Sequence, residues 1–339
     1  MKSLLFISIL TLSLSTFASE VNFEPGPFPE MLPVDGTSFY MGAETGRGES
    51  DEHPQHLVTL SPYNISRFEV TNAQFALVLN WAMEQELIND MTGTQFKEME
   101  NNSTRRNRDV YFKGRKVKEI SDDSGIIFQS GQFIPATRDG IALGNHPVES
   151  VSWYGAVAYA NWLSQLQNLE PCYDDRFNLI QPVRKGYRLP TEAEWERAAS
   201  WKPGSPTQKW QYSVQADEIG VTRSNFNSHN PLKSVGMNSF PYTSPVGHFN
   251  GISPDTVDSP SPVGCYDMSG NVKEWCQDSF YNYTSVDKKD PIVTKNSEFK
   301  MVRGGGWSSA ANFCRSTDRG WTPPHMSFKS FGFRLAQYR

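Results

Sequence analysis

Two stretches of the chain repeat apolar residues at helical spacing, and each follows a residue that is suited to cap a helix. Thr71 precedes a run from Asn72 to about Glu84, and Ser152 precedes a run from Trp153 to Leu166. Ser and Thr side chains accept a hydrogen bond from a free N–H group of the first turn, so they mark helix starts. We predict an α-helix over each run.

A third helix is predicted from Pro190 to Ala199. Thr191 and Glu194 have the spacing of a capping box, in which each side chain accepts a hydrogen bond from a backbone N–H group of the first turn. Between the first two helices, about residues 89–145, the chain is polar and alternates in short bursts such as Val110-Tyr111-Phe112. This alternation predicts hairpins inserted into one domain, not a separate domain.

The first residues have the features of an export signal. The positive start Met1-Lys2 precedes an apolar run from Leu4 to Leu14 and small residues around Ala18. A membrane anchor is the alternative, but the run is shorter than the roughly 20 residues that a spanning helix needs. We predict a signal peptide over residues 1–19 and one domain over residues 20–339, exported to the periplasm or outside the cell.

Composition favours a mixed α+β protein with much irregular structure. The chain has 25 Gly, 22 Pro and 13% aromatic residues, which is typical of turns and loops held by aromatic packing. Its formal net charge is -5 and its Lys and Arg residues are scattered, so no nucleic-acid-binding surface is indicated. No second apolar run of membrane-spanning length follows the signal segment.

Four cysteines remain after export: Cys172, Cys265, Cys276 and Cys314. No two of them form a Cys-x-x-Cys pair, which disfavours a zinc site or a thioredoxin-like redox site. An even number of cysteines in an oxidising compartment predicts disulfides, and the sequence alone permits three pairings.

Short motifs rich in Gly, Trp and charged residues follow one another along the chain. They are Gly36–Gly42, Glu52–Leu60, Glu69–Asn72, His146–Val148, Val151–Trp153, Tyr187–Glu196, Gly264–Trp275, Arg303–Trp307, Cys314–Ser316 and Gly332–Arg334. This series resembles the formylglycine-generating-enzyme, or sulfatase-modifying-factor, family over nearly the whole mature chain. The resemblance implies a C-type-lectin-like α+β fold with a small twisted sheet, about three helices, large loops and bound calcium.

Members of this family serve several functions, which the fold alone does not distinguish. Some oxidise a sulfatase cysteine to formylglycine with copper and oxygen. Others work beside iron-binding domains, help to mature a siderophore chromophore or display variable binding surfaces. The function must therefore be inferred from the site residues.

The resemblance implies calcium ligands in the Gly264–Trp275 motif. The side chains of Asp267 and Glu274 and the carbonyls of Gly270 and Val272 match such ligands, and calcium prefers oxygen donors of these kinds. The alternative is that the two acidic residues only cap the loop.

A second set of calcium ligands matches the family less closely. It comprises the side chains of Asn225 and Asn238 and the carbonyls of Phe226 and Phe240. Because its side chains are neutral amides, and affinity grows with ligand charge, weaker binding is expected there.

The family's oxidases hold Cu(I) with two thiolates that follow the Arg-Gly-Gly motif, because soft sulfur ligands suit this ion. Counted from Arg303, Ser309 takes the place of the first thiolate and Cys314 that of the second. One thiolate and one hydroxyl do not make a two-thiolate site, so copper is not expected, and iron is left unassigned. If the chain is an oxidase, Ser309 and Cys314 are its candidate catalytic residues.

The resemblance also suggests a structural role for Cys314. The family fold brings the segments around Cys276 and Cys314 together, so a Cys276–Cys314 disulfide is expected, with other pairings or free thiols as alternatives.

Ligand recognition is another function that the resemblance suggests. In relatives this part of the fold faces the substrate or ligand, and here Arg303, Trp307, Arg319 and Trp321 are the candidate contacts. Aromatic residues and Arg anchor many interfaces, and residues 308–329 are rich in surface-type side chains. The alternative for Arg303 is a buried role, in which its five donors satisfy loop carbonyls.

The missing cysteine pair favours a binding or non-standard oxidative or maturation role over formylglycine generation. The alternatives are an oxidase that acts on a sulfatase cysteine or a secreted metabolite, and a calcium-stabilised, lectin-like binding or display protein. An accessory subunit of another enzyme is a third. The sequence does not specify whether the ligand is a peptide, a protein or a small molecule.

Overall fold

The computed structural model describes residues 25–98, 109–182, 184–202, 205, 208–226, 242–294 and 297–339. The predicted signal peptide, residues 1–19, lies outside the described residues. Within them, no helix combines the length and the apolar character that crossing a membrane requires.

All three predicted helices are present. They are α1 (Asn72–Glu84), α2 (Trp153–Leu166) and α3 (Glu192–Ser200). Thr71, Ser152 and Thr191 each accept a hydrogen bond from a backbone N–H group of the first turn, as their positions predicted. Glu194 completes the predicted capping box of α3.

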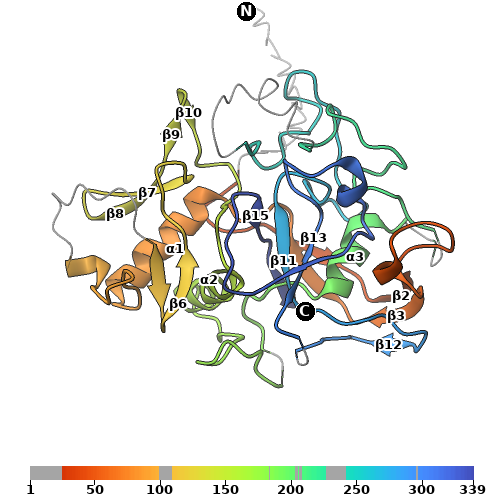
Figure 1. Cartoon of the computed structure of the whole chain (residues 1–339), viewed down its shortest axis with the longest axis horizontal. Coiled ribbons are helices and arrows are strands. Elements are labelled where there is room, and N and C mark those ends of the chain that lie inside the picture. The colour runs from red at the N-terminus through yellow and green to blue at the C-terminus, as the bar shows by residue number, and fades with distance from the viewer. Residues whose placement is uncertain are drawn as a thin grey trace, which may run out of the picture.

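A four-stranded sheet crosses the centre of the molecule in the order β14-β13-β11-β15 (Figure 1). Its strands are β11 (Lys273–Ser279), β13 (Lys300–Arg303), β14 (Gly320–Thr322) and β15 (Phe331–Gly332). β13 runs antiparallel to β11 and β14, and β15 runs parallel to β11. The register places Glu274 opposite Arg303 and Lys300 opposite Thr322, so β13 carries one cation at its start and another at its end.

Two three-stranded sheets lie outside this centre, in the orders β12-β3-β2 and β1-β4-β16. Their strands are β1 (Met31–Val34), β2 (Thr37–Met41), β3 (His56–Leu60), β4 (Tyr63–Ser66), β12 (Lys288–Lys289) and β16 (Ala336–Tyr338). Three single-turn helices are η1 (Ser50–Glu52), η2 (Phe96–Glu98) and η3 (Ala311–Cys314). Small sheets, three α-helices and long irregular stretches in the described chain confirm the predicted α+β class.

The chain between α1 and α2 contains three hairpins, which lie at one side of the molecule in Figure 1. They are β5–β6 (Val110–Phe112, Arg115–Lys118), β7–β8 (Ile126–Gln129, Gln132–Pro135) and β9–β10 (Thr137–Arg138, Ile141–Ala142). Buried side chains from the first two, such as Val110 and Phe133, join the hydrophobic core around α1 and α2.

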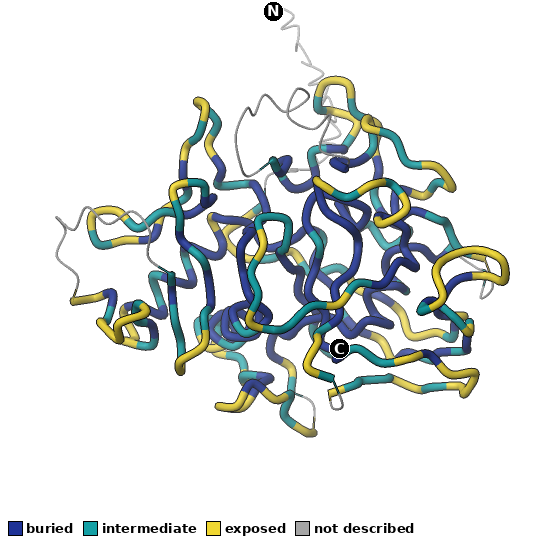
Figure 2. Tube along the Cα trace, in the orientation of Figure 1, coloured by how far each residue is buried: buried dark blue, intermediate teal, exposed yellow. Residues whose placement is uncertain are grey.

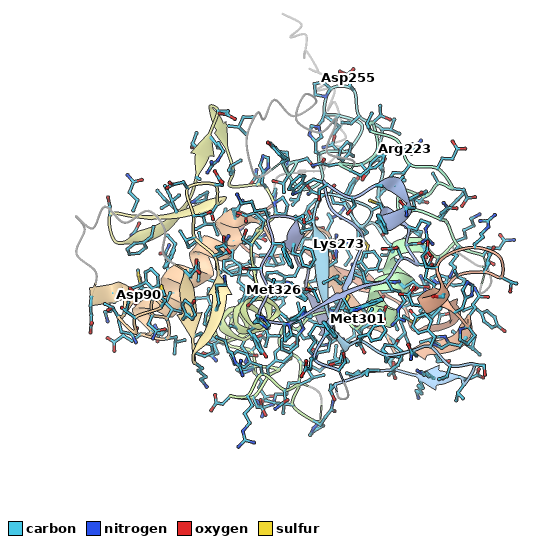
Figure 3. The ribbon with its side chains drawn as sticks, in the orientation of Figure 1. Asp90, Arg223, Asp255, Lys273, Met301 and Met326 are labelled. Atoms are coloured by element: carbon cyan, nitrogen blue, oxygen red, sulfur yellow. The ribbon has the colours of Figure 1, made fainter. Side chains whose placement is uncertain are left out.

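The four-stranded sheet separates the two largest hydrophobic clusters. Trp275 on β11 packs into the cluster of α1 and α2, whereas its neighbour Cys276 packs into the cluster of α3, because successive strand residues point to opposite faces. Figure 2 shows the buried chain gathered around this sheet, and Figure 3 shows the labelled Lys273 and Met301 near the middle of the molecule. Side chains of β11 and β13 can therefore reach either α2 or α3.

Candidate functional site

The Gly-rich segment after β13 makes a sharp turn. Gly304 and Gly305 have φ values of 91° and 68°, a region that residues with a Cβ atom rarely adopt. A Cβ on Gly305 would lie 2.5 Å from the Cys314 sulfur, and one on Gly304 would lie 3.0 Å from the Trp195 ring. Both glycines are therefore needed to let this turn pack against α3 and η3.

Ser309 and Cys314 are the residues predicted to stand where the family's oxidases have copper-binding cysteines. The Ser309 hydroxyl accepts a hydrogen bond of 3.0 Å from the Gly306 N–H group and so closes the turn. Cys314 is fully buried, and burial raises the pKa of its thiol to about 12. Cu(I) prefers soft sulfur ligands, and the Ser309 hydroxyl is a hard oxygen donor, so only one suitable ligand is present. These residues do not fit a two-thiolate copper site.

The predicted Cys276–Cys314 disulfide is wrong, because all four cysteines are free thiols. Cys276 points from β11 into the cluster of α3, beside Trp195 and Met301. Cys314 belongs to a separate small cluster with Tyr212. The two side chains therefore serve different parts of the core.

Arg303, a predicted ligand contact, is instead fully buried. Its guanidinium donates to Glu196 Oε2 over 2.5 Å and to the carbonyls of residues 316–318 over 2.6 to 2.9 Å. The structure therefore confirms the alternative role predicted for Arg303, in which a buried guanidinium donates to loop carbonyls.

Arg319, also predicted to contact ligand, is buried in a two-point ion pair with Glu192, with distances of 2.7 and 2.9 Å. Arg315 forms a similar pair with Glu52, at 2.7 and 2.9 Å. Glu192 and Glu196 lie one turn apart on α3 and therefore share a face of that helix. These arginines attach the loop of residues 303–319 to the core and do not face solvent.

Of the two tryptophans predicted to contact ligand, Trp321 is exposed and Trp307 is buried. The Trp307 indole donates to the Lys329 carbonyl over 3.1 Å. Trp321 lies on the edge strand β14, with its ring centroid 4.3 Å from that of Phe280. The exposed large aromatic residues of segment 308–329 are Phe313, Trp321 and Phe328.

The acidic residues of the predicted calcium motif have partners already. Glu274 pairs with the Arg334 guanidinium at 2.6 and 2.8 Å and accepts a further hydrogen bond of 2.8 Å from the Trp195 indole. Asp267 accepts one of 2.7 Å from the Gly247 N–H group. The Asp267 side of the loop thus fits a cation better than the Glu274 side, where calcium would compete with Arg334.

A third buried acid, Glu69, holds this loop in place. Its carboxylate accepts hydrogen bonds from the Asn271 side chain (2.7 Å) and the Val272 N–H group (3.2 Å). Burial and then the nearby charges of Asp267 and Glu274 raise the pKa of Glu69 well above its usual range, and burial raises that of Asp267 to about 6. Excess negative charge of this kind is what a bound cation would relieve.

Asn225 offers the clearest donor for a cation. Within the described chain its Oδ1 atom is buried and has no hydrogen-bond partner, and such orphaned buried oxygens need an explanation. Its carbonyl accepts from the Asn271 N–H group over 2.7 Å, so Asn225 adjoins the calcium motif. Phe226 is buried beside it, whereas Asn238 and Phe240 lie outside the described residues.

No group of three or more His, Cys, Asp or Glu side chains in the described ranges is arranged to hold a metal. Any calcium site there would therefore depend on amide and carbonyl oxygens as well as carboxylates. Sequence reasoning did not assign roles to Glu69, Asn271 or Glu192. All three stand in the motifs of the chain, which was the only signal that marked them.

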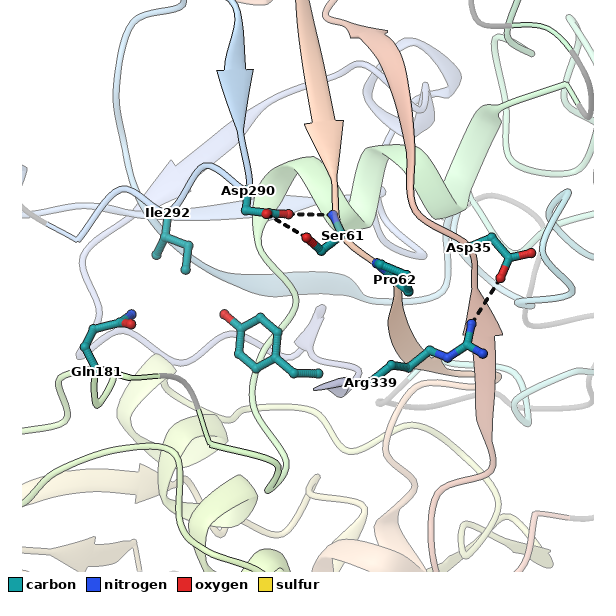
Figure 4. A pocket seen from close by; sticks show the side chains of 8 residues that line it. Asp35, Ser61, Pro62, Gln181, Asp290, Ile292 and Arg339 are labelled. Atoms are coloured by element: carbon teal, nitrogen blue, oxygen red, sulfur yellow. Dashed lines mark hydrogen bonds and ion pairs between the residues drawn. The ribbon is translucent and has the colours of Figure 1, made fainter.

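A cavity of about 760 Å³ opens near the C-terminal strand β16 and the start of β4 (Figure 4). Four of its polar residues form two pairs: Arg339 lies 3.1 Å from Asp35, and Ser61 donates to Asp290 from its N–H and hydroxyl groups over 2.6 and 2.8 Å. This cavity presents no cluster of groups that is arranged for chemistry.

A family model and several known proteins match most of this chain. The model of the sulfatase-modifying factor enzyme 1-like domain matches residues 17–339. Serine/threonine-protein kinase pkn1 of Chlamydia caviae is 29% identical over 319 residues, which are 93% of this chain and 39% of the kinase. The formylglycine-generating enzyme of Thermomonospora curvata is 27% identical over 323 residues, 90% of this chain and 92% of that enzyme. The chain thus spans about two fifths of the length of the kinases that it matches.

Solved structures are similar over most of the chain. Variable protein 1 of Treponema denticola matches with a TM-score of 0.56 and 26% identity, covering 91% of this chain and 95% of that one. PvdO from Pseudomonas aeruginosa matches with a TM-score of 0.58 and 23% identity, covering 93% and 97%. The second likeness bears on the fold alone.

Proposed function

The chain belongs to the sulfatase-modifying factor enzyme 1-like domain family, and we propose that it is a ligand-recognising member that performs no copper-dependent oxidation. The proposal rests on the pair Ser309 and Cys314. A hydroxyl that closes a turn and a buried thiol whose pKa is raised to about 12 stand where the family's oxidases have two thiolates. Cu(I) prefers soft sulfur ligands, and this pair of residues supplies only one sulfur.

The loop of residues 308–329 supports a role in recognition. Ion pairs of Arg315 with Glu52 and of Arg319 with Glu192 anchor its first half. Phe313, Trp321 and Phe328 are exposed along it. A loop that is ordered before binding loses less entropy when a ligand arrives, and exposed aromatic residues supply contact area. This arrangement is suited to binding a partner without chemical change.

We further propose that calcium stabilises the scaffold and that the protein acts in the periplasm or outside the cell. The proposed ligands in the first set are Asp267 and Glu274 with the carbonyls of Gly270 and Val272. In the second set they are Asn225 and the carbonyl of Phe226, with Asn238 and Phe240 outside the described residues. When bound, the ion would supply positive charge beside the buried acids. The export signal predicted over residues 1–19 is the basis for the location.

An oxidation assay tests the proposal. The purified chain is supplied with copper, oxygen and a sulfatase-type peptide that contains a cysteine, and the peptide mass is followed, with a formylglycine-generating enzyme as positive control. We expect no conversion of the cysteine to an aldehyde. Conversion that disappears in a Cys314→Ala variant would show that the chain is an oxidase.

A further inference from the structure

A pocket of about 560 Å³ lies between the start of α2 and the start of β13. Aromatic and proline side chains form much of its wall: Trp153, Tyr154, Phe177, Phe299, Pro323 and Pro324. Small-molecule sites typically have volumes of roughly 300–1,000 Å³ and combine apolar walls with a few polar groups. The pocket therefore has the size and lining of a site for a small ligand.

Lys300 places a half-buried ammonium group in this pocket. Its Nζ atom lies 4.1 Å from the centroid of the Trp153 ring and donates to the Gln277 carbonyl over 3.1 Å. In the described part of the chain, no carboxylate is within the 4.0 Å of Nζ that an ion pair requires. The positive charge is thus held in place without an anionic partner.

Burial lowers the pKa of Lys300 to about 8, so its ammonium is still mostly protonated at pH 7. Asp278, the acid that acts electrostatically on Lys300, is already engaged. Its carboxylate accepts hydrogen bonds of 2.7 Å from the N–H groups of Glu192 and Val293. Burial also raises the pKa of Asp278 to about 7, so near neutral pH its negative charge is incomplete. Asp278 therefore does not cancel the charge of Lys300.

The other charged groups of the pocket leave it positive. Arg176 and Glu298 line it as exposed side chains of opposite sign, and His325 adds an exposed imidazole. Lys300 is then the surplus charge. The Trp153 face is occupied by the ammonium of Lys300, so the pocket is not a free aromatic cage for a cationic ligand.

We propose that this pocket binds a small molecule that carries a carboxylate on an aromatic or aliphatic group. The carboxylate pairs with Lys300 Nζ, and the apolar group contacts Trp153 and Phe299. This inference rests on the proposed recognition role and names the chemistry of the ligand.

The proposal is tested by calorimetric titration of the full mature chain with three probes. They share a phenylpropyl frame and differ in the polar group at its end. The probes are 3-phenylpropionate, 3-phenylpropan-1-ol and 3-phenylpropylamine. We expect the acid to bind at least about tenfold more tightly than the alcohol, because hydrogen bonds to charged groups are the stronger ones. The amine should bind most weakly.

Lys300→Met should abolish the preference for the acid while leaving the affinity for the alcohol within about threefold, because the apolar walls remain. Lys288→Met is the matched control: Lys288 also lies over a ring, 4.8 Å from the centroid of Tyr281, but does not line the pocket. It should keep the preference. Phe299→Ala should weaken the acid and the alcohol by the same factor, and thermal unfolding confirms that each variant is folded.

Three results would overturn the inference: no binding of any probe, equal binding of acid and alcohol, or a preference for the acid that survives Lys300→Met. None of these results would show that the chain oxidises a substrate with copper. Conversely, copper-dependent oxidation of a peptide cysteine would contradict the proposed function without changing the order of probe affinities.

Discussion

Arg303 and Lys300 stand three residues apart on one strand, yet their surroundings differ. Arg303 is fully buried and bonded to Glu196 and to the carbonyls of residues 316–318. Lys300 is half-buried and bonded to one carbonyl and one indole face. The Arg303 guanidinium donates to a carboxylate and three carbonyls and so supports the fold. The Lys300 ammonium lies beside a cavity without an anion and is available to a ligand.

Strand geometry explains why the two cations diverge. Successive side chains of a strand alternate between the faces of a sheet, so residues three apart point in opposite directions. Arg303 therefore points toward α3 and its glutamates, and Lys300 points toward Trp153 at the start of α2. One short strand thus supplies both a structural cation and a candidate binding cation.

The largest effect should come from removing the structural cation. Arg303→Met leaves buried acids and three loop carbonyls without their partner, and breaking a buried ion pair in this way costs about 3–5 kcal/mol. Urea denaturation measures the free energy of unfolding. Lys300→Met is the matched change on the same strand and should cost no more than about 1 kcal/mol. An equal loss of unfolding free energy in the two variants would contradict the proposed difference between Arg303 and Lys300.

A smaller effect on stability is expected from Asp278, the acid that acts electrostatically on Lys300. Burial raises its pKa from 3.8 to about 7 in the folded chain, so the folded state binds the proton more tightly than the unfolded state. Its contribution to stability is present below the unfolded pKa and is lost as pH rises through the folded one, a fall of about 2 kcal/mol between pH 5 and 7.5.

Asp278→Asn should remove this part of the pH dependence. The test compares urea denaturation of the two proteins between pH 5 and 7.5. If the variant loses stability with pH as steeply as the parent, then Asp278 is ionised over the whole range and already balances Lys300.

The smallest effect is expected at Glu69, Asp267 and Glu274, where the uncompensated charge is negative and not positive as at Lys300. If uncompensated buried charge marks a binding site, these acids should attract a cation as Lys300 attracts an anion. Calcium at ten times its dissociation constant should stabilise the chain by about 1.4 kcal/mol. Thermal unfolding with calcium or with a chelator measures this gain, which Asp267→Asn should reduce. An unchanged melting temperature would contradict the proposed ion.

Local features of the sequence were sufficient to predict the helices, because Thr71, Ser152 and Thr191 cap them within a single turn. The motif series was sufficient to predict the fold. Side-chain directions were not predictable in the same way. The disulfide was wrong because Cys276 points toward α3, a direction that depends on how β11 lies between two clusters.

The aromatic pocket had no local signal at all. Trp153 appeared only as the first residue of a helix and the last residue of a short motif, and Lys300 stands outside every motif. They meet because the four-stranded sheet brings β13 beside the start of α2, about 150 residues away in the chain. Tertiary contacts of this kind cannot be inferred from periodicity or spacing.

The central claim, that this family member has lost its copper site, is tested most directly by titrating the folded chain with Cu(I) against a coloured chelator. The account predicts that the chelator keeps the metal, because Ser309 offers a hydroxyl and Cys314 a buried neutral thiol. Uptake of one Cu(I) per chain that is lost in Cys314→Ala would contradict it.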